Sequence, residues 1–455
     1  MLKDKFLLNK DFFKSVFAIA LPIAMQNVIS FGVNAMDSIM LGKLGDIAVS
    51  GANLGGQPFF FLMIAGFGMA GGGAVLIAQY WGKGQKDVIK RIMRISMLVV
   101  TILSAIATFV CFVFPYQVMS MFTHEAEVLE ASASYLKVLS LGFLFFSISS
   151  NYMSSLRAVE NVKMSTIVYS MSFFVNVFFN YMFIFGKFGA PALGVVGAAL
   201  GTVIARVFEF TSTLIYMYFI EKDIGFRMHC MFKIDKELFK DYIHHALPVV
   251  GNEMIWGLGS IATSMIMGRI GSTFVAANSV TGVIGQLAQV FIFGIANAAA
   301  VVCGKTIGTG EMEKAQKTAQ TLLLMGVTCG FISTAIIFLL RNPFLSIYDI
   351  TPEAKSAAYS MMAVLACTQP IMAIDVVSIV GILRGGGDTR LALALDGGGM
   401  WLINIPMGIL TGLVLRIPPQ FIFLAMRSDS FIKVFIESHR IFSRKWIRTV
   451  TRDNV

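Results

Sequence analysis

Charged residues are scarce in this sequence, and so are the residue types that mark small secreted or metal-binding scaffolds. Only 14% of the 455 residues are Asp, Glu, Lys or Arg, and there are five cysteines and four tryptophans. With 56% hydrophobic residues, this composition excludes an ordinary water-soluble globular domain. The cysteines lack the paired spacing of a metal site or a disulfide framework, so we expect buried, unpaired thiols.

Sequence motifs of enzymes are also missing. The chain contains no Gly-x-Ser-x-Gly, no His-Glu-x-x-His and no Walker loop, and its five histidines lie at the ends of apolar stretches or in loops. We therefore expect no enzyme, no resident cofactor and no self-contained ATP-driven pump. A passive channel remains an alternative, which uphill transport would distinguish.

Long, continuous apolar stretches dominate the chain. A helix that crosses a bilayer needs roughly 20 apolar residues, and continuous rather than alternating apolar runs argue against a β-barrel. The sequence predicts an all-α polytopic membrane protein with twelve transmembrane helices. Arg427, Asp429 and Lys433 interrupt the last span. The predicted spans are 15–40, 52–80, 93–115, 131–153, 164–186, 193–219, 241–268, 275–303, 318–340, 357–381, 391–415 and 418–436.

Basic residues predict the orientation. If the N-terminus is cytoplasmic, most Lys and Arg residues fall on the inner side, as in 83–94, 222–240 and 427–452. Anionic lipid at the inner surface then explains the net charge of +10, and no nucleic-acid partner is needed to explain it. The basic lead Met1–Lys14 lacks a cleavage site. We expect a multi-pass protein of the cell (inner) membrane with both termini cytoplasmic.

The first span recurs in the second half of the chain. Leu21–Gly45 (LPIAMQNVISFGVNAMDSIMLGKLG) aligns with Leu247–Gly271 (LPVVGNEMIWGLGSIATSMIMGRIG), both opening on Leu-Pro and closing on Gly-basic-x-Gly. Each copy carries one acid, but at different positions, because Asp37 lies opposite Thr263 and Glu253 lies opposite Asn27.

Further pairs extend the repeat at nearly the same offset. Gly82-Lys83-Gly84 matches Gly308-Thr309-Gly310, and Leu156-Arg157 matches Leu383-Arg384. Because the offset covers six spans, the halves are parallel repeats related by an axis along the membrane normal. The predicted domains are an N-lobe (1–220, spans one to six), a cytoplasmic interlobe linker (221–240), and a C-lobe (241–455, spans seven to twelve) with a basic cytoplasmic tail.

The ordered set of motifs resembles the multidrug and toxic compound extrusion (MATE) family, in its NorM-like bacterial branch. The motifs are the Leu-Pro…Asp…Gly-x-Leu-Gly opening, Gly82-Lys83-Gly84, Leu156-Arg157, Leu383-Arg384-Gly-Gly-Gly-Asp-Thr-Arg and the NVFFNYMFIFG stretch of span five. The resemblance covers essentially the whole chain. It implies export of small organic, mostly cationic compounds in exchange for Na⁺ or H⁺, by a protein that we expect to be a monomer in lipid.

Acidic residues inside spans are the candidate functional groups. A charge at the centre of a span costs roughly 2.5 to 3.5 kcal/mol, so Asp37, Glu253 and Asp375 are expected to face a cavity. Each lacks a basic neighbour in its own span. Arg206 and Glu209 are three residues apart, and we interpret them as a self-satisfied ion pair.

The resemblance assigns roles to these acids. It implies that Glu253 and Asp375 belong to a C-lobe cation site, tentatively for Na⁺, and that Asp37 works with Asn176 and Asn180 of span five. Asn404 is the counterpart of Asn176 in span eleven, and helix–helix packing would explain it equally well. The list of candidate cation-coupling residues is Asp37, Glu253 and Asp375.

The hypothesis is a cation-coupled drug exporter that works by alternating access. Na⁺ is favoured over H⁺, because the pair Glu253 and Asp375 is present beside Asp37. The alternative is a flippase for lipid-linked saccharides from the same broad superfamily. A flippase would be expected to line its cavity with Arg or Lys, whereas the spans before the interrupted last one hold only Arg206 in their interiors, with Lys137 near an end.

Overall fold

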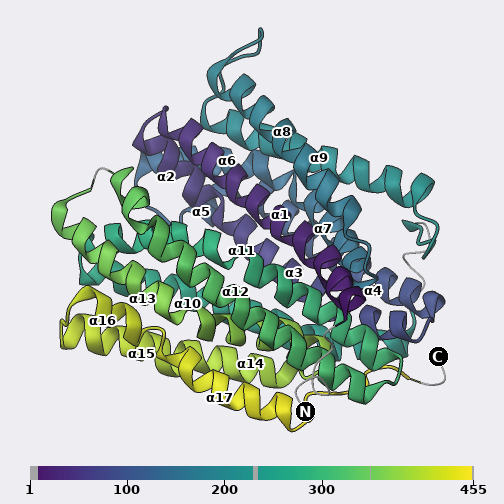
Figure 1. The fold of residues 1–455 in the computed structure, drawn as a ribbon. Helices are drawn as coiled ribbons and strands as arrows, with labels where there is room; N and C mark the ends of the chain where they lie inside the picture. Colours follow the sequence, from purple (N-terminus) through teal and green to yellow (C-terminus); the bar gives the residue numbers. More distant parts are fainter. Residues whose placement is uncertain (1–8, 229–233, 349, 453–455) are drawn as a thin grey trace. The chain divides into compact units, whose positions relative to one another are not determined.

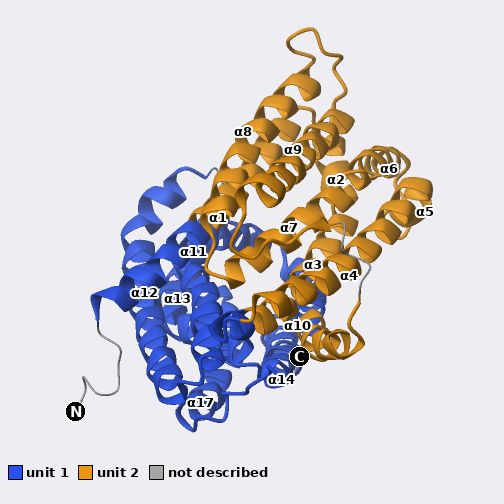
Figure 2. Cartoon of the chain, turned by 90° about the vertical axis from the view of Figure 1, so that its right-hand side faces the viewer, with its two compact units in different colours: residues 1–24, 78–84, 251–455 blue, residues 25–77, 85–250 orange. Residues whose placement is uncertain are grey.

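The computed structural model describes residues 9–228, 234–348 and 350–452, and these residues form helices and connecting loops without a β-strand (Figure 1). They group into two compact units, coloured separately in Figure 2. Unit 1 comprises residues 1–24, 78–84 and 251–455, and unit 2 comprises residues 25–77 and 85–250. The predicted domain boundaries remain a prediction, and residues 229–233 of the linker, with Cys230, lie outside the described residues.

Unit 2 contains the helices of the first half of the chain. Within it, α8 and α9 pack along each other, and the loop between them begins at Gly186, which adopts the left-handed conformation that ends a helix. Its helices are α1 from residue 25 onward (Lys10–Gly42), α2 (Asp46–Gly55), α3 up to residue 77 (Gln57–Gly82), α4 (Lys86–Val113), α5 (Pro115–Met119), α6 (Ala126–Ser140), α7 (Phe143–Ala158), α8 (Lys163–Phe185), α9 (Val195–Ile215) with its π-helical extension η1 (Tyr216–Ile220), and α10 up to residue 250 (Lys236–Ile270).

Unit 1 contains the helices of the second half, together with α1 up to residue 24 and α3 from residue 78. Its α11, α12 and α13 pack together around a buried apolar cluster that α16 completes. Its helices are α10 from residue 251, α11 (Ser272–Gly308), α12 (Met312–Ser346), α13 (Pro352–Val376), η3 (Val377–Leu383), α14 (Thr389–Gly398), η4 (Gly399–Asn404), α15 (Ile405–Gly408), η5 (Ile409–Val414), α16 (Pro419–Ala425) and α17 (Ser428–Phe442).

The predicted spans all fall on helical segments. Among the described residues, nine helices are long and apolar enough to cross a membrane, and α6 with α7, bent by 52° at their junction, would make a tenth. The two remaining predicted spans, on α10 and on α16 with α17, are helical but too polar or too short for that test. The all-α polytopic fold class is confirmed.

The repeat also appears in backbone conformation. Gly45 and Gly271, which close the first helix of each half, both have positive φ angles (100° and 145°). Gly84 and Gly310, in the matched loops after α3 and α11, have φ angles of 73° and 80°. These conformations favour glycine because it lacks a Cβ atom, so the matched glycines mark equivalent turns.

Span eleven differs from its counterpart in span five. Span five is the regular helix α8, whereas span eleven contains the π-helical segments η4 and η5. A π-helical turn widens the helix and frees backbone and side-chain groups for other contacts, and such turns are frequent at functional sites. Asn404 is the last residue of η4. Asp396 lies near the end of α14, the helix that precedes η4.

The predicted basic tail is held against unit 1 in its described part. Trp446 is fully buried, and its Nε1 donates a hydrogen bond to Gln316 Oε1 (2.9 Å). The buried carboxylate of Asp388 forms ion pairs with Arg440 (2.8 Å) and Arg448 (3.0 Å). Asp388 therefore compensates the charges of Arg440 and Arg448, two basic residues that the sequence predicts at the lipid surface.

Candidate cation-binding sites

The first candidate site lies in unit 2, where α1, α8 and α9 contribute polar side chains. Asn180 Nδ2 donates to Asp37 Oδ1 (2.6 Å) and also lies 3.2 Å from Asn176 Oδ1. Asn176 Nδ2 in turn donates to Thr202 Oγ1 at 3.4 Å. Both asparagines are buried. The structure therefore brings the three predicted residues of this lobe into one hydrogen-bonded chain that continues to α9.

Oxygen atoms are the notable feature of this chain. Asn180 Oδ1 is buried and has no hydrogen-bond partner among the described residues. This oxygen lies against Gly201 of α9, whereas the amide nitrogen of the same side chain contacts Asp37. Carboxylate oxygens are ligands that suit a hard monovalent cation, and a carboxylate also suits a proton. The geometry could therefore accept either ion at Asp37.

Gly201 allows the close packing of α9 against Asn180. A Cβ atom at Gly201 would lie 2.1 Å from Asn180 Oδ1 and 2.8 Å from its backbone nitrogen. Since Oδ1 cannot move without disturbing the contact with Asp37, glycine is the residue that this helix pair needs here.

The predicted ion pair of span six is confirmed. Arg206 Nη1 lies 2.8 Å from Glu209 Oε1 and 2.9 Å from Oε2. Ser172 of α8 donates a further hydrogen bond to Glu209 Oε1 (2.6 Å), and the guanidinium group of Arg206 stacks on Phe146 (4.8 Å to the ring centre). Both charges of this pair are satisfied within unit 2.

The second candidate region lies in unit 1, where Glu253 has a basic partner. Arg384 Nη1 lies 2.7 Å from Glu253 Oε1, in a pair whose side chains are 14% and 24% exposed. Arg384 belongs to the repeated Leu-Arg motif, and it comes from the segment after η3. The basic partner that span seven lacks is therefore supplied by another part of the fold.

Asp375 also has a basic partner, which comes from α17. Lys433 Nζ lies 3.0 Å from Asp375 Oδ2, and Ser430 Oγ donates to the same oxygen (2.6 Å). Lys433 Nζ also lies 3.3 Å from both Asp396 Oδ1 and Asp429 Oδ2. The side chains of Asp375 and Lys433 are 6% and 7% exposed, so this ion pair is almost fully enclosed.

The structure thus gives the two predicted C-lobe acids separate partners. Glu253 pairs with Arg384, and Asp375 pairs with Lys433. In the described part of the chain, no group of three Asp, Glu, His or Cys side chains is arranged to hold a metal ion. The buried Oδ1 of Asn404, the other residue predicted for this lobe, lacks a hydrogen-bond partner among the described residues.

Several residues of these sites were missed by the sequence analysis. Asp396 lies in predicted span eleven and should have counted as an intramembrane acid. Lys433 and Asp429 were treated only as interruptions of span twelve. Their spacing with Glu437, at positions 429, 433 and 437, places them on one face of a helix, which is the signal that could have found them.

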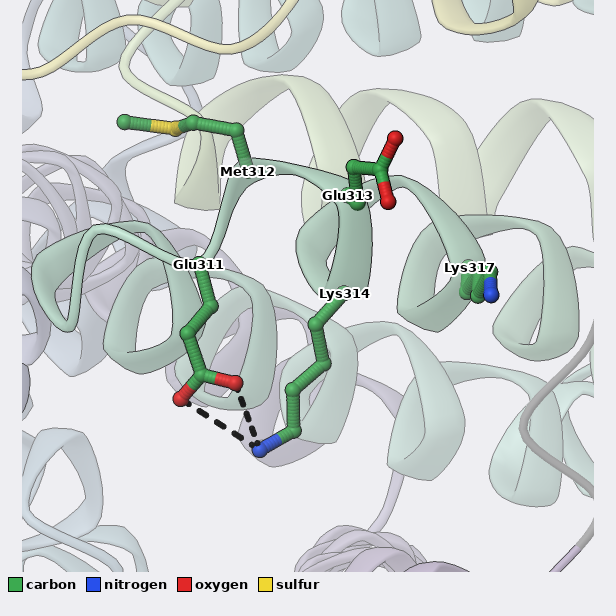
Figure 3. Close-up of a pocket in the computed structure, with 5 residues that line it drawn as sticks. All are labelled: Glu311, Met312, Glu313, Lys314 and Lys317. Carbon is green, nitrogen blue, oxygen red and sulfur yellow. Dashed lines mark hydrogen bonds and ion pairs between the residues drawn. The ribbon is translucent and has the colours of Figure 1, made fainter.

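A surface hollow at the start of α12 is unrelated to these sites. It is lined by Glu311, Met312, Glu313, Lys314 and Lys317. Figure 3 shows Glu311 and Lys314 joined by an ion pair (3.1 Å), with Met312 and Glu313 directed away from them. The paired side chains are about half exposed, which is typical of a solvated helix end.

Known proteins are similar to this chain over most of its length. The MatE family model matches residues 22–182 and again residues 248–410, two segments that begin at the same offset as the repeat. The probable multidrug resistance protein NorM of Thermotoga maritima is 24% identical over 97% of this chain and 95% of its own length. The multidrug resistance protein MdtK of Photorhabdus laumondii is 23% identical over 89% of each chain.

A solved structure gives the same fold. A mutant of the Vibrio cholerae MATE transporter VcmN superposes with a TM-score of 0.87 at 13% identity, covering 97% of this chain and 98% of that one. The similarity to this structure concerns the fold alone. Membership of a protein family rests on the match to the family model. On these grounds the chain belongs to the MatE family of multidrug and toxic compound extrusion transporters.

Proposed function

We propose that this protein exports small organic cations across the cell (inner) membrane in exchange for Na⁺ or H⁺, by alternating access and as a monomer in lipid. Family membership and the multi-pass helical fold support secondary transport. The relatives named as multidrug resistance proteins support drugs and toxic compounds as cargo.

The observation that carries the proposal is the environment of Asp37. Its carboxylate accepts a hydrogen bond from the amide of Asn180, and none of the described basic residues forms an ion pair with it. A carboxylate inside a transmembrane helix with only neutral hydrogen-bond partners is costly, unless a mobile cation or proton neutralises it. Asp37 is therefore the residue on which we place the coupling ion.

Ion binding at Asp37 would change the contacts of three helices. A proton or Na⁺ on the carboxylate competes with the Asn180 amide, which also bonds to Asn176. A ligand shifts a conformational equilibrium by its difference in affinity between the two states. If the exchange is electrogenic, each net charge that moves inward supplies about 2.3 kcal/mol per 100 mV, which corresponds to a drug gradient of roughly fifty-fold.

The presence of Glu253 and Asp375 beside Asp37 in the sequence favours Na⁺. Each of these two acids has its own basic partner, so they support a shared Na⁺ site less strongly than their presence alone suggested. We keep both ions in the proposal for Asp37, since its carboxylate, which has a neutral hydrogen-bond partner, would serve either.

The flippase alternative needs positive charge for a pyrophosphate group. Three basic side chains of the predicted spans or their ends are engaged by acids: Arg206 by Glu209, Arg384 by Glu253 and Lys433 by three aspartates. Their charges are compensated within the protein, and this supports a cationic cargo over an anionic one.

The test is export of a fluorescent organic cation from proteoliposomes under an imposed Na⁺ gradient or an imposed pH gradient. We expect one gradient to drive export in the natural protein and Asp37→Asn to abolish the driven component. Glu353→Gln, at the exposed start of α13, is the control and should export normally. Failure of both gradients to drive export, or undiminished export by Asp37→Asn, would contradict the proposal.

A further inference from the structure

Helix α17 has its polar side chains inside and its apolar side chains outside. Asp429, Ser430, Lys433 and Glu437 are at most 8% exposed. Most large apolar residues of the same helix are turned outward, with Phe435 78% exposed, while Ile441 is buried. The outward residues are Phe431, Ile432, Phe435, Ile436 and Phe442. This polarity is the reverse of that of a helix in a water-soluble protein, and it indicates a polar site enclosed in an apolar surrounding.

Lys433 lies at the centre of that site. Its ammonium group contacts carboxylate oxygens from three helices, at 3.0 Å from Asp375 of α13 and at 3.3 Å from Asp396 of α14 and from Asp429 of α17. A lysine ammonium is a compact point charge with donors that can serve several carboxylates at once. It therefore lies where a free cation bridging these acids would have to lie.

Glu437 adds a fourth acid on the same face. It is fully buried, and neither of its oxygens accepts a hydrogen bond from the described residues. The charged groups that face it are Asp375, Lys433 and Asp396. Lys433 thus supplies positive charge to a cluster of four acids.

We infer that the ammonium group of Lys433 takes the place of a coupling metal ion in this cluster, so that the acids of unit 1 do not bind Na⁺. The inference deepens the proposed cation coupling and rests on it. Lys433 stays bound to the protein, keeps its charge and lies between Asp375, Asp396 and Asp429. Unit 1 would thus carry a built-in cation, and Na⁺, if used, would bind only at Asp37.

Binding of radioactive ²²Na⁺ to the purified, full-length protein tests this directly and needs no transported drug. The Asp37→Asn variant removes the site of unit 2, and we expect it to show no saturable Na⁺ binding. Adding Lys433→Met removes the charge at nearly the same side-chain length. We expect this double variant to gain a saturable Na⁺ site that a further Asp375→Asn change abolishes.

The conservative variant Lys433→Arg, in the Asp37→Asn background, keeps a tethered cation and should bind no Na⁺. Thermal unfolding of each purified variant identifies those that retain the fold. Saturable binding by Asp37→Asn that depends on Asp375 would overturn the inference, and this result needs no change at Lys433. A folded Asp37→Asn, Lys433→Met variant without Na⁺ binding would overturn it equally.

Export by the natural protein in proteoliposomes is measured separately. If the natural protein shows no export at all, the proposed function fails, while the ²²Na⁺ result still reports on Lys433.

Discussion

The two units solve the same problem, a carboxylate inside a membrane protein, in different ways. In unit 2, Asp37 bonds to the neutral amide of Asn180, and the neighbouring charges Arg206 and Glu209 satisfy each other. In unit 1, Asp375 bonds to Lys433, which also contacts Asp396 and Asp429. The unit with neutral partners keeps its acid available to an external ion, and the other unit supplies its own cation.

The repeated Leu-Arg motif shows the same division. In unit 2, Arg157 Nη1 lies 3.5 Å from the amide oxygen of Gln26 on α1. In unit 1, the equivalent Arg384 forms a 2.7 Å ion pair with Glu253 on α10. An arginine at the same place in the repeat thus meets a neutral side chain in one half and an acid in the other. The scaffold is duplicated, and its charges are distributed differently.

Removing the carboxylate of unit 2 should have the largest effect. We expect Asp37→Asn to abolish ion-driven accumulation, which at 100 mV amounts to a loss of about fifty-fold in the drug gradient per charge moved. Asn keeps the size and the hydrogen-bonding capacity of the side chain, so the fold should persist. Steady-state drug gradients in proteoliposomes measure the loss, and thermal unfolding checks the fold.

Crowding the neutral site should have the next largest effect. In Gly201→Ala the new methyl group meets Asn180 Oδ1, so we expect destabilisation by about 1–3 kcal/mol together with weakened ion coupling. Gly66→Ala is the matched control, because a Cβ atom there has no neighbour within 4 Å. Equal stability and equal coupling of the two variants would show that Asn180 can move without consequence.

Breaking the ion pair of Glu253 should cost less, because the pair is partly exposed. We expect Arg384→Gln to lower the free energy of unfolding by about 2 kcal/mol, since it leaves an uncompensated charge. The double variant with Glu253→Gln should recover part of that loss. Lys314→Gln, in the exposed pair of Figure 3, is the comparison and should change stability much less. Additive losses in the double variant would mean that the pair is not coupled.

The smallest effect is expected where unit 2 loses a single neutral hydrogen bond. Ser172→Ala removes one donor from Glu209 while Arg206 still holds both carboxylate oxygens, so destabilisation of about 1 kcal/mol is expected. Ser170→Ala, whose hydroxyl bonds only to the backbone of its own helix, should be nearly silent. If Ser172→Ala lowered the free energy of unfolding more than Arg384→Gln does, the ranking of the two units would be reversed.

The fold and the unit 2 site were accessible from sequence, whereas the unit 1 cluster was not. Apolar run lengths predict the spans, and the four-residue spacing of Asn176 and Asn180 places them on one face of α8. Lys433 was not linked to Asp375 because the two are 58 residues apart, and only packing of α17 against α13 joins them. Long-range charge pairing depends on tertiary contacts, which periodicity does not encode.

The central claim, that one unit binds the external ion while the other carries its own cation, is tested most directly by charge movement after a rapid change of Na⁺ or pH. Protein reconstituted on a solid-supported membrane would be exposed to the ion that drives export. We expect Asp37→Asn to abolish the Na⁺-induced current, if Na⁺ is the driving ion, and Asp375→Asn to leave it in place. A Na⁺ current that survives Asp37→Asn and disappears in Asp375→Asn would contradict this division between the units.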